Sequence, residues 1–276
     1  MKHWKLGALL AAFCITVVCS LLFVVPLLTY HEPDLPAELD LSSAIGNAID
    51  FFEGSLEPDA LLWLDVMHRR FGITEFADSL QRYDEVLATR GSEQASRMRV
   101  FRRIADYNNL VRAEDLSAIL KTFEYYFVYA LYCDRLGLPI DYPELLEKEA
   151  SRGDYYLTHV LLSLVWIQEN GCELALPDGF IDEVYQANAA IINNEPMIVN
   201  DLKLEAAAFL YLAGQGALVD DSFIESVISS QNDDGSWDFS SDGQGDSAWH
   251  TTILGLLLLL HVEYPADSYP PMLDSA

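Results

Sequence analysis

The sequence QNDDGSW, at residues 231–237, separates two stretches that are predicted to be helical, and SAWHTT, at residues 247–252, opens the second of them. The residues that follow are mostly apolar as far as position 263. A helix that is apolar on all sides has to be covered by other helices over most of its surface. The fold is therefore expected to bury this C-terminal helix among others.

Apolar spacing predicts helices along the rest of the chain. They are expected over approximately residues 41–54, 58–71, 73–88, 92–109, 113–136, 142–151, 154–170, 178–194, 200–214, 219–231 and 247–263. No run of alternating apolar and polar residues predicts a strand, so the expected fold class is all-α. From residue 113 onward long apolar helices alternate with more polar ones. This alternation predicts helical hairpins packed side by side, each with an inner helix and a covering outer helix.

Residues recur at a nearly constant interval in the C-terminal half of the chain. Gly171 and Gly216 each close an apolar helix and are 45 residues apart. His159 precedes Glu205 by 46 residues, and Glu205 precedes His250 by 45. The interval corresponds to one helical hairpin, so these polar residues are expected at similar positions on successive inner helices.

Asp201 lies four residues before Glu205 and therefore on the same helical face. His159, Asp201, Glu205 and His250 are expected to meet at one mouth of the barrel. There they would act as catalytic acids and bases, because His titrates near neutral pH and a neighbouring carboxylate orients it. In a second interpretation, His159, Glu205 and His250 bind a divalent transition metal such as zinc, manganese or iron. In a third, which the sequence favours, the side chains only satisfy helix ends and hydrogen bonds between helices.

The Gln, three residues, Gly, one residue, Trp pattern of QNDDGSW, followed by the apolar helix, resembles the α/α toroid of terpenoid cyclases and protein prenyltransferases. In those families the motif ties the end of an outer helix to the next inner helix, the Gly permits the tight turn and the Trp covers the joint. The resemblance is most specific over residues 219–263 and is compatible in period back to about residue 113. It implies helical hairpins arranged as a partial or complete α/α toroid.

The resemblance also bears on metal binding. His250 matches the zinc-binding His of prenyltransferase β subunits, whose other ligands are an Asp and a Cys two residues later. Asp201 would stand for that Asp, but the residue two positions on is Lys203, so the zinc site of the family is incomplete. The acidic Asp-x-Asp-Asp cluster of the cyclases does not occur in this sequence, which disfavours terpene cyclisation.

Residues 6–30 form an uninterrupted uncharged segment, long enough to cross a bilayer as a helix. Lys2 and Lys5 precede the segment, and no further Lys or Arg occurs before Arg69, so the N-terminus is predicted to stay in the cytoplasm. Residues 1–30 are thus expected to be a cytoplasmic tail and transmembrane anchor, and residues 31–276 an extracytoplasmic domain. A cleaved signal peptide is the alternative, and a lipoprotein cysteine at Cys19 is less favoured.

All 43 acidic residues follow this segment, and the chain has a formal charge of −27. Such a surface disfavours nucleic acid and anionic membrane as partners. Cys133 and Cys172 lie beyond the anchor, where an oxidising compartment would permit a disulfide. Burial statistics favour two buried thiols instead. The only basic cluster contains Arg97, Arg99, Arg102, Arg103 and Arg112. It suits a phosphate or carboxylate ligand, although pairing with internal Asp and Glu is favoured.

The sequence contains no Gly-rich phosphate loop, Gly-x-Ser-x-Gly elbow or His-Glu-x-x-His motif. The leading functional hypothesis is a membrane-anchored binding or scaffolding module that needs no catalytic group. The alternative is a metal-dependent or acid/base enzyme acting on a lipid-like or small polar substrate at the barrel mouth. The two differ in whether the four polar side chains meet in a pocket.

Overall fold

A computed structural model describes residues 40–119, 125–239, 248–266 and 268–273. Residues from Asp40 onward belong to one compact unit. Within the described ranges, none of the helices has the length and apolar character needed to cross a membrane. The predicted anchor, residues 6–30, lies outside the described residues.

The described part of the chain contains helices and no strand, so the predicted all-α class is confirmed. The α-helices are α2 (Leu41–Phe51), α3 (Pro58–Phe71), α4 (Ser79–Thr89), α5 (Ser92–Phe101), α6 (Ala113–Ile119), α7 (Tyr125–Leu131), α8 (Cys133–Leu136), α9 (Tyr142–Ala150), α10 (Asp154–Glu169), α11 (Phe180–Asn193), α12 (Asp201–Leu212), α13 (Asp221–Ser229) and α14 (Ala248–Glu263). Three short 3₁₀ helices are η1 (Thr74–Phe76), η2 (Arg102–Ile104) and η3 (Gly216–Leu218).

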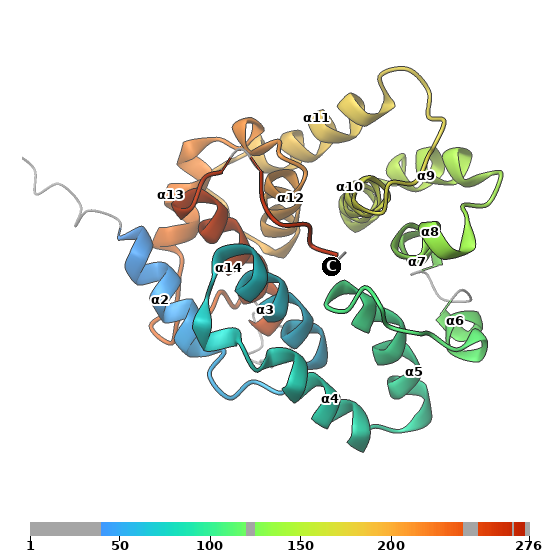
Figure 1. Cartoon of the computed structure of the whole chain (residues 1–276). Coiled ribbons are helices and arrows are strands. Elements are labelled where there is room, and N and C mark those ends of the chain that lie inside the picture. Colours follow the sequence, from blue (N-terminus) through green and yellow to red (C-terminus); the bar gives the residue numbers. More distant parts are fainter. Residues whose placement is uncertain (1–39, 120–124, 240–247, 267, 274–276) are drawn as a thin grey trace, which may run out of the picture. The chain divides into compact units, whose positions relative to one another are not determined.

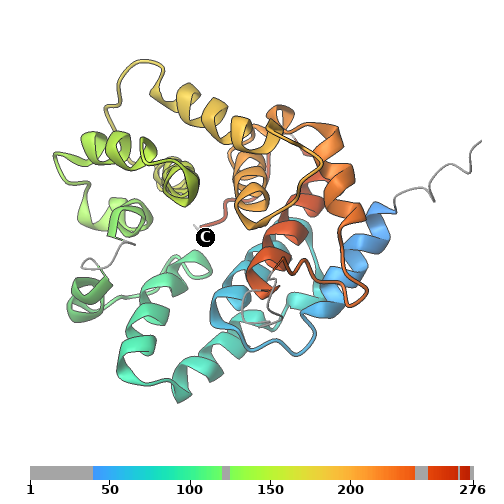
Figure 2. The same ribbon diagram turned by 180° about the vertical axis from the view of Figure 1, so that it is seen from behind.

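The long apolar helices pack against one another, and more polar helices cover them (Figure 1). α14 contacts α3 and α12, α12 contacts α10, and α10 contacts α7. The helices α3, α14, α12, α10 and α7 are the inner helices. Each of four outer helices packs against one of them: α2 against α14, α4 against α3, α11 against α12 and α9 against α10. The view from behind shows the same order of helices (Figure 2). The three helices that carry the predicted polar residues, α10, α12 and α14, are therefore consecutive neighbours.

The helices predicted over residues 92–109 and 113–136 were too long. The stretch predicted as one helix over residues 113–136 contains α6, α7 and α8, and α6 packs on α5 whereas α7 packs on α10. Tyr132 leaves helical geometry between α7 and α8, with φ −119° and ψ 16°. The helix predicted over 92–109 ends with η2, because Asp106 accepts from the Asn108 N–H and Asn109 donates to the Arg99 carbonyl. Such side-chain bonds to the backbone compete with helix continuation.

The QNDDGSW segment joins three helices. Gln231 Nε2 donates to the Ala44 carbonyl of α2 at 2.8 Å and to the Gly235 carbonyl at 3.0 Å. Gly235 has φ +84°, and a Cβ there would collide with the Asn47 carbonyl. The Trp237 ring is fully buried against Gly255 of α14, and its Nε1 donates to the Val227 carbonyl of α13 at 2.8 Å. The motif thus fixes α13 and α14 to the first described helix.

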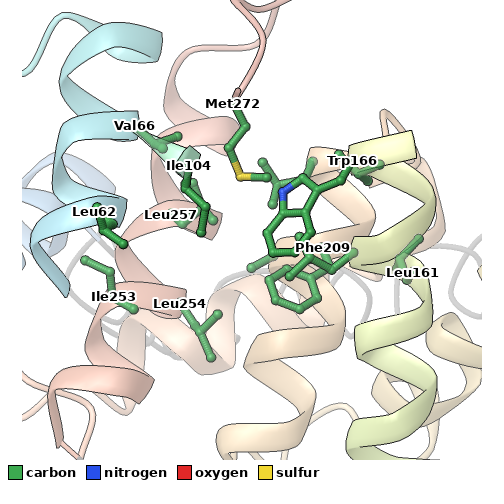
Figure 3. Packing of buried hydrophobic residues seen from close by; sticks show 14 of the residues in the cluster. Leu62, Val66, Ile104, Leu161, Trp166, Phe209, Ile253, Leu254, Leu257 and Met272 are labelled. Carbon is green, nitrogen blue, oxygen red and sulfur yellow. The ribbon is translucent and has the colours of Figure 1, made fainter. Parts of the chain in front are cut away.

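The C-terminal segment is part of the core. Met272 and Leu273 are buried, and Met272 points into the cluster of apolar side chains that contains Trp166 (Figure 3). The Glu169 carboxylate accepts the Met272 and Leu273 N–H groups at 2.8 and 2.9 Å. Arg69 donates to the Met272 carbonyl at 3.0 Å. The segment is therefore held by its backbone as well as by its side chains.

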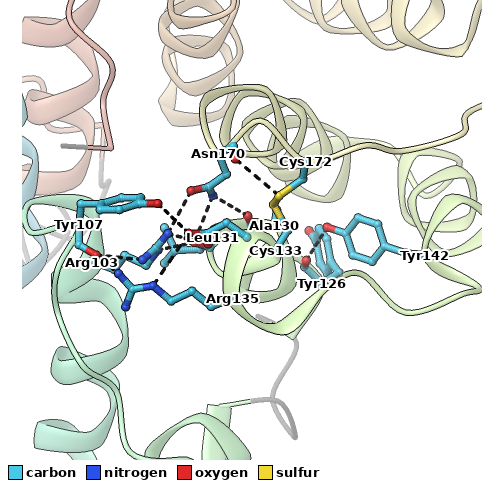
Figure 4. The surroundings of a disulfide bond; sticks show 11 residues. Arg103, Tyr107, Tyr126, Ala130, Leu131, Cys133, Arg135, Tyr142, Asn170 and Cys172 are labelled. Atoms are coloured by element: carbon cyan, nitrogen blue, oxygen red, sulfur yellow. Dashed lines mark hydrogen bonds and ion pairs between the residues drawn. A yellow bond between two sulfur atoms is a disulfide. The ribbon is translucent and has the colours of Figure 1, made fainter. Parts of the chain in front are cut away.

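Cys133 and Cys172 form a disulfide, so the expectation of two buried thiols was wrong (Figure 4). The end of α10 is tied to the end of α7, which brings the two cysteines together. Asn170 Nδ2 donates to the Ala130 carbonyl at 3.0 Å, and buried Arg103 donates to the Leu131 carbonyl at 2.7 Å and to Asn170 Oδ1 at 3.1 Å. These bonds place the cysteines within reach of each other, with Cα atoms 6.2 Å apart.

A Cys133→Ser, Cys172→Ser double variant is expected to lose about 2–4 kcal/mol of unfolding free energy. The bond links residues 39 positions apart, so its removal frees a long loop in the unfolded chain. Urea denaturation of the variant, and of the unaltered protein with and without reductant, measures the loss. Equal midpoints for the oxidised and reduced proteins would contradict the prediction.

Candidate functional site

The four predicted polar residues lie together on three neighbouring helices. Asp201 opens α12, where Asn200 caps the helix by accepting from the Lys203 N–H at 3.0 Å. Glu205 follows one turn later, so both carboxyl groups lie on one face of α12. His159 comes from the first half of α10 and His250 from the first turn of α14. The contacts among these side chains bring all four residues together.

His250 is held by both carboxyl groups of α12. Its Nδ1 lies 2.7 Å from Asp201 Oδ1 and its Nε2 lies 3.7 Å from Glu205 Oε2. The second oxygen of Asp201 accepts from the Tyr155 hydroxyl at 2.7 Å. Because an ionised carboxylate can only accept, the His250 proton sits on Nδ1, which fixes the ring orientation.

His159 is oriented by its own helix. Its Nδ1 lies 2.6 Å from the Tyr155 carbonyl and 3.3 Å from Glu205 Oε1. A carbonyl oxygen only accepts, so Nδ1 carries the proton. The described residues provide no hydrogen-bond partner for Nε2 of this ring.

Glu205 lies between the two imidazoles and is only 1% exposed. Burial raises the pKa of Glu205, and the nearby histidines and the hydrogen bond from Thr158 Oγ1 oppose this rise without cancelling it. The carboxyl group therefore keeps its proton at a higher pH than an ordinary Glu does.

Asp201 behaves in the opposite way. Burial raises its pKa, but the hydrogen bond and charge of His250 and the hydrogen bond from Tyr155 outweigh burial, so the net pKa is lowered. For His250, burial lowers the pKa, whereas the hydrogen bond and charge of Asp201 and the charge of Glu205 raise it to a net higher value. Two carboxyl groups one turn apart thus have pKa values shifted in opposite directions, which is the pattern of acid/base sites.

Glu205, His159 and His250 line a cavity of about 290 Å³, whereas Asp201 stands behind His250 and does not line it. The remaining polar lining consists of Asp59, which the sequence did not single out, and Arg97, which the sequence placed only in the basic cluster. Asp59 lies in the first turn of α3, and its two oxygens lie 2.8 and 2.6 Å from Arg97 Nη1 of α5. The aromatic lining consists of Trp63, Phe101, Phe127, Trp166, Phe209 and Trp249.

The basic cluster is paired internally, as the sequence favoured. Arg99 binds Asp115 at 2.7 Å, Arg102 binds Asp84 at 2.9 Å and Asp106, and Arg103 binds Asp134 at 2.7 Å. Arg112 lies 4.0 Å from Asp115. Of this cluster, Arg97 is the member that lines the cavity.

Metal binding by His159, Glu205 and His250 stays a prediction. Across the described ranges, no three or more His, Cys, Asp or Glu side chains are grouped as a metal site. Lys203 donates its Nζ to the Asn194 and Glu195 carbonyls at 2.5 and 2.7 Å. Lys203 therefore anchors the segment before α12.

A Glu205→Gln variant tests the raised pKa of Glu205 through stability. Above the ordinary Glu pKa of 4.5 the unfolded chain releases this proton while the folded protein keeps it, so the free energy of unfolding falls as pH rises to the folded pKa. The fall is up to about 1.4 kcal/mol per pH unit. Gln does not titrate, so the variant should gain stability relative to the unaltered protein across this window and not below pH 4.

Urea unfolding at pH 3.5–8, followed by tryptophan fluorescence, measures this difference. Glu225→Gln on α13, where the side chain is exposed, is the matched control. Parallel pH dependence of the Glu205→Gln variant and the unaltered protein would contradict the raised pKa.

Comparison of the chain with known protein families, with curated proteins and with solved structures found no match.

Proposed function

We propose that the chain is an enzyme that protonates a small substrate in the cavity, with Glu205 as the general acid. The observation that carries the proposal is a buried carboxyl group with a raised pKa, placed between two imidazoles on the wall of a cavity. A general acid has to hold its proton near the working pH, which requires such a raised pKa.

The neighbouring histidines suit the loss of the proton from Glu205. His250, whose pKa is raised and which Asp201 orients, lies 3.7 Å from one oxygen of Glu205, and His159 lies 3.3 Å from the other. A protonated imidazole at this distance stabilises the carboxylate that forms when Glu205 gives up its proton. A binding module would not require this convergence, which is why the enzyme hypothesis is preferred.

The fold we propose for this site is a partial or complete α/α toroid. What supports it is the alternation of inner and covering helices and the bracing of α13 and α14 onto α2 by QNDDGSW. We also propose that residues 6–30 anchor the chain in a membrane with the remainder extracytoplasmic. The Cys133–Cys172 disulfide supports an oxidising location.

The proposed function is tested with chromogenic esters, phosphates and glycosides of 4-nitrophenol. The proteins compared are the unaltered protein and its Glu205→Gln and Glu225→Gln variants. We expect turnover of one class, a loss of about 10²- to 10⁴-fold in the Glu205 variant and no loss in the Glu225 control. Measurement of the Glu205 carboxyl ¹³C shift against pH gives a readout that needs no substrate. Ionisation of Glu205 in the ordinary Glu range, or equal turnover by all three proteins, would overturn the proposal.

Elemental analysis of the purified protein tests the hypothesis that a metal is bound. If a transition metal is bound, His159, Glu205 and His250 are the side chains on the cavity wall that would hold it. A His159→Ala, His250→Ala double variant should then lose the metal. If this variant retained the metal, the metal would have to bind at another site.

A further inference from the structure

Two carboxyl groups line the same cavity in unlike surroundings. Glu205 is buried and lies beside Thr158 and two imidazoles. Asp59, on α3, is held by both oxygens against Arg97, and its side chain is 27% exposed. Burial thus favours the protonated form of Glu205, whereas Asp59 belongs to a partly solvated ion pair with Arg97. Glycoside hydrolysis requires a pair of this kind, one carboxyl group as acid and the other as base or nucleophile.

The lining of the cavity fits a sugar better than a hydrocarbon. Trp63 and Trp249 are half-buried, so part of each indole is open at the cavity lining. Aromatic faces pack against the C–H faces of a sugar ring, and its hydroxyl groups can bond to the carboxyl, imidazole and guanidinium groups nearby. A hydrocarbon in the same place would displace water from these polar groups without replacing the hydrogen bonds that the water makes.

A second cavity adjoins the first at the ion pair. Its volume is about 320 Å³, and Asp59 and Arg97 belong to both cavities. Its other polar lining residues are Glu57, Arg90 and Gln94. A ligand of two linked rings, one in each cavity, would place the linkage beside Asp59.

From this arrangement we infer that the substrate is a glycoside and that Asp59 is the second catalytic carboxylate. The inference rests on the function proposed for Glu205. Glu205 donates its proton to the glycosidic oxygen while the bond from the anomeric carbon to that oxygen breaks. A water molecule forms the new bond to the anomeric carbon, and Asp59 accepts the proton that this water releases. The products are two sugars, and the acidic proton returns from Asp59 to Glu205 through solvent.

The test uses aryl glycosides that differ in leaving group, together with Asp59→Ala, Asp59→Asn and Glu205→Gln variants. We expect each Asp59 variant to lose about 10²- to 10⁴-fold in kcat, and sodium azide to restore turnover by Asp59→Ala with formation of a glycosyl azide. Glu205→Gln should lose more activity on phenyl than on 2,4-dinitrophenyl glycosides, because a good leaving group needs no proton. The control is Asp84→Ala, which removes the Asp84–Arg102 ion pair of 2.9 Å outside the cavity.

Azide rescue confined to Asp59→Ala would support the assignment, because a purely structural role of Asp59 would not produce a glycosyl azide. Asp59 variants with unchanged kcat, or absence of glycoside hydrolysis by the unaltered protein, would overturn it. Glu205-dependent turnover of esters or phosphates without turnover of glycosides would refute the glycoside inference and leave the general-acid function standing. Ionisation of Glu205 in the ordinary range would instead remove the proposed function itself.

Discussion

Deletion of residues 270–276 is expected to lower the free energy of unfolding by about 4 kcal/mol or more. Met272 and Leu273 are fully buried, and truncation of one such side chain to Ala typically costs about 2–5 kcal/mol. The deletion also removes both N–H groups that the Glu169 carboxylate accepts and the carbonyl that Arg69 binds. Because domains are stable by only about 5–15 kcal/mol, the truncated protein should be close to unfolding at 37 °C.

Urea and thermal denaturation of the truncated protein measure this loss. A Met272→Ala variant isolates the side-chain part, and Met197→Ala, at an exposed Met, is its matched control. Because Met272 and Trp166 belong to the same buried cluster and Trp166 lines the cavity, the truncated protein should also show altered tryptophan fluorescence (Figure 3). Unchanged denaturation midpoints would show that the C-terminal segment is not part of the folded core.

Trp237→Ala is expected to cost about 3–5 kcal/mol, as for other large aromatic side chains removed from a core. The substitution leaves a cavity beside Gly255 and leaves the Val227 carbonyl without the indole N–H. It also separates the end of α13 from α14, which carries His250. The loss of stability should therefore be accompanied by a lower activity or ligand affinity of the remaining folded protein.

A pair of Gly→Ala variants tests the same joint with a smaller change. A Cβ on Gly255 would lie 2.8 Å from the Trp237 ring, whereas a Cβ on Gly46 of α2 would meet nothing within 4 Å. Gly255→Ala should destabilise the protein, and Gly46→Ala should be neutral or stabilising by about 0.5–1 kcal/mol. Equal stability of the two variants, measured by urea denaturation, would contradict the packing of Trp237 on α14.

The hairpin interval explains why the polar cluster could be predicted from the sequence. When successive hairpins have nearly equal length and pack side by side, residues at equal offsets lie at similar heights on neighbouring helices. His159, Glu205 and His250 follow this rule on α10, α12 and α14. Asp59 and Arg97 could not be found in this way, because they belong to α3 and α5 and the repeat interval begins only at about residue 113.

Local pattern therefore determined the helices, the helical class and the approximate meeting of three polar residues, because apolar periodicity and hairpin length are properties of the chain itself. Tertiary structure decided the rest. Asp201 and Glu205 both carry a carboxyl group on α12. Their pKa values are shifted in opposite directions because the two groups differ in burial and in their hydrogen-bond and charge partners. The pairing of Cys133 with Cys172, the partnership of Asp59 with Arg97 and the burial of Met272 likewise depend on distances between segments far apart in sequence, which no local pattern encodes.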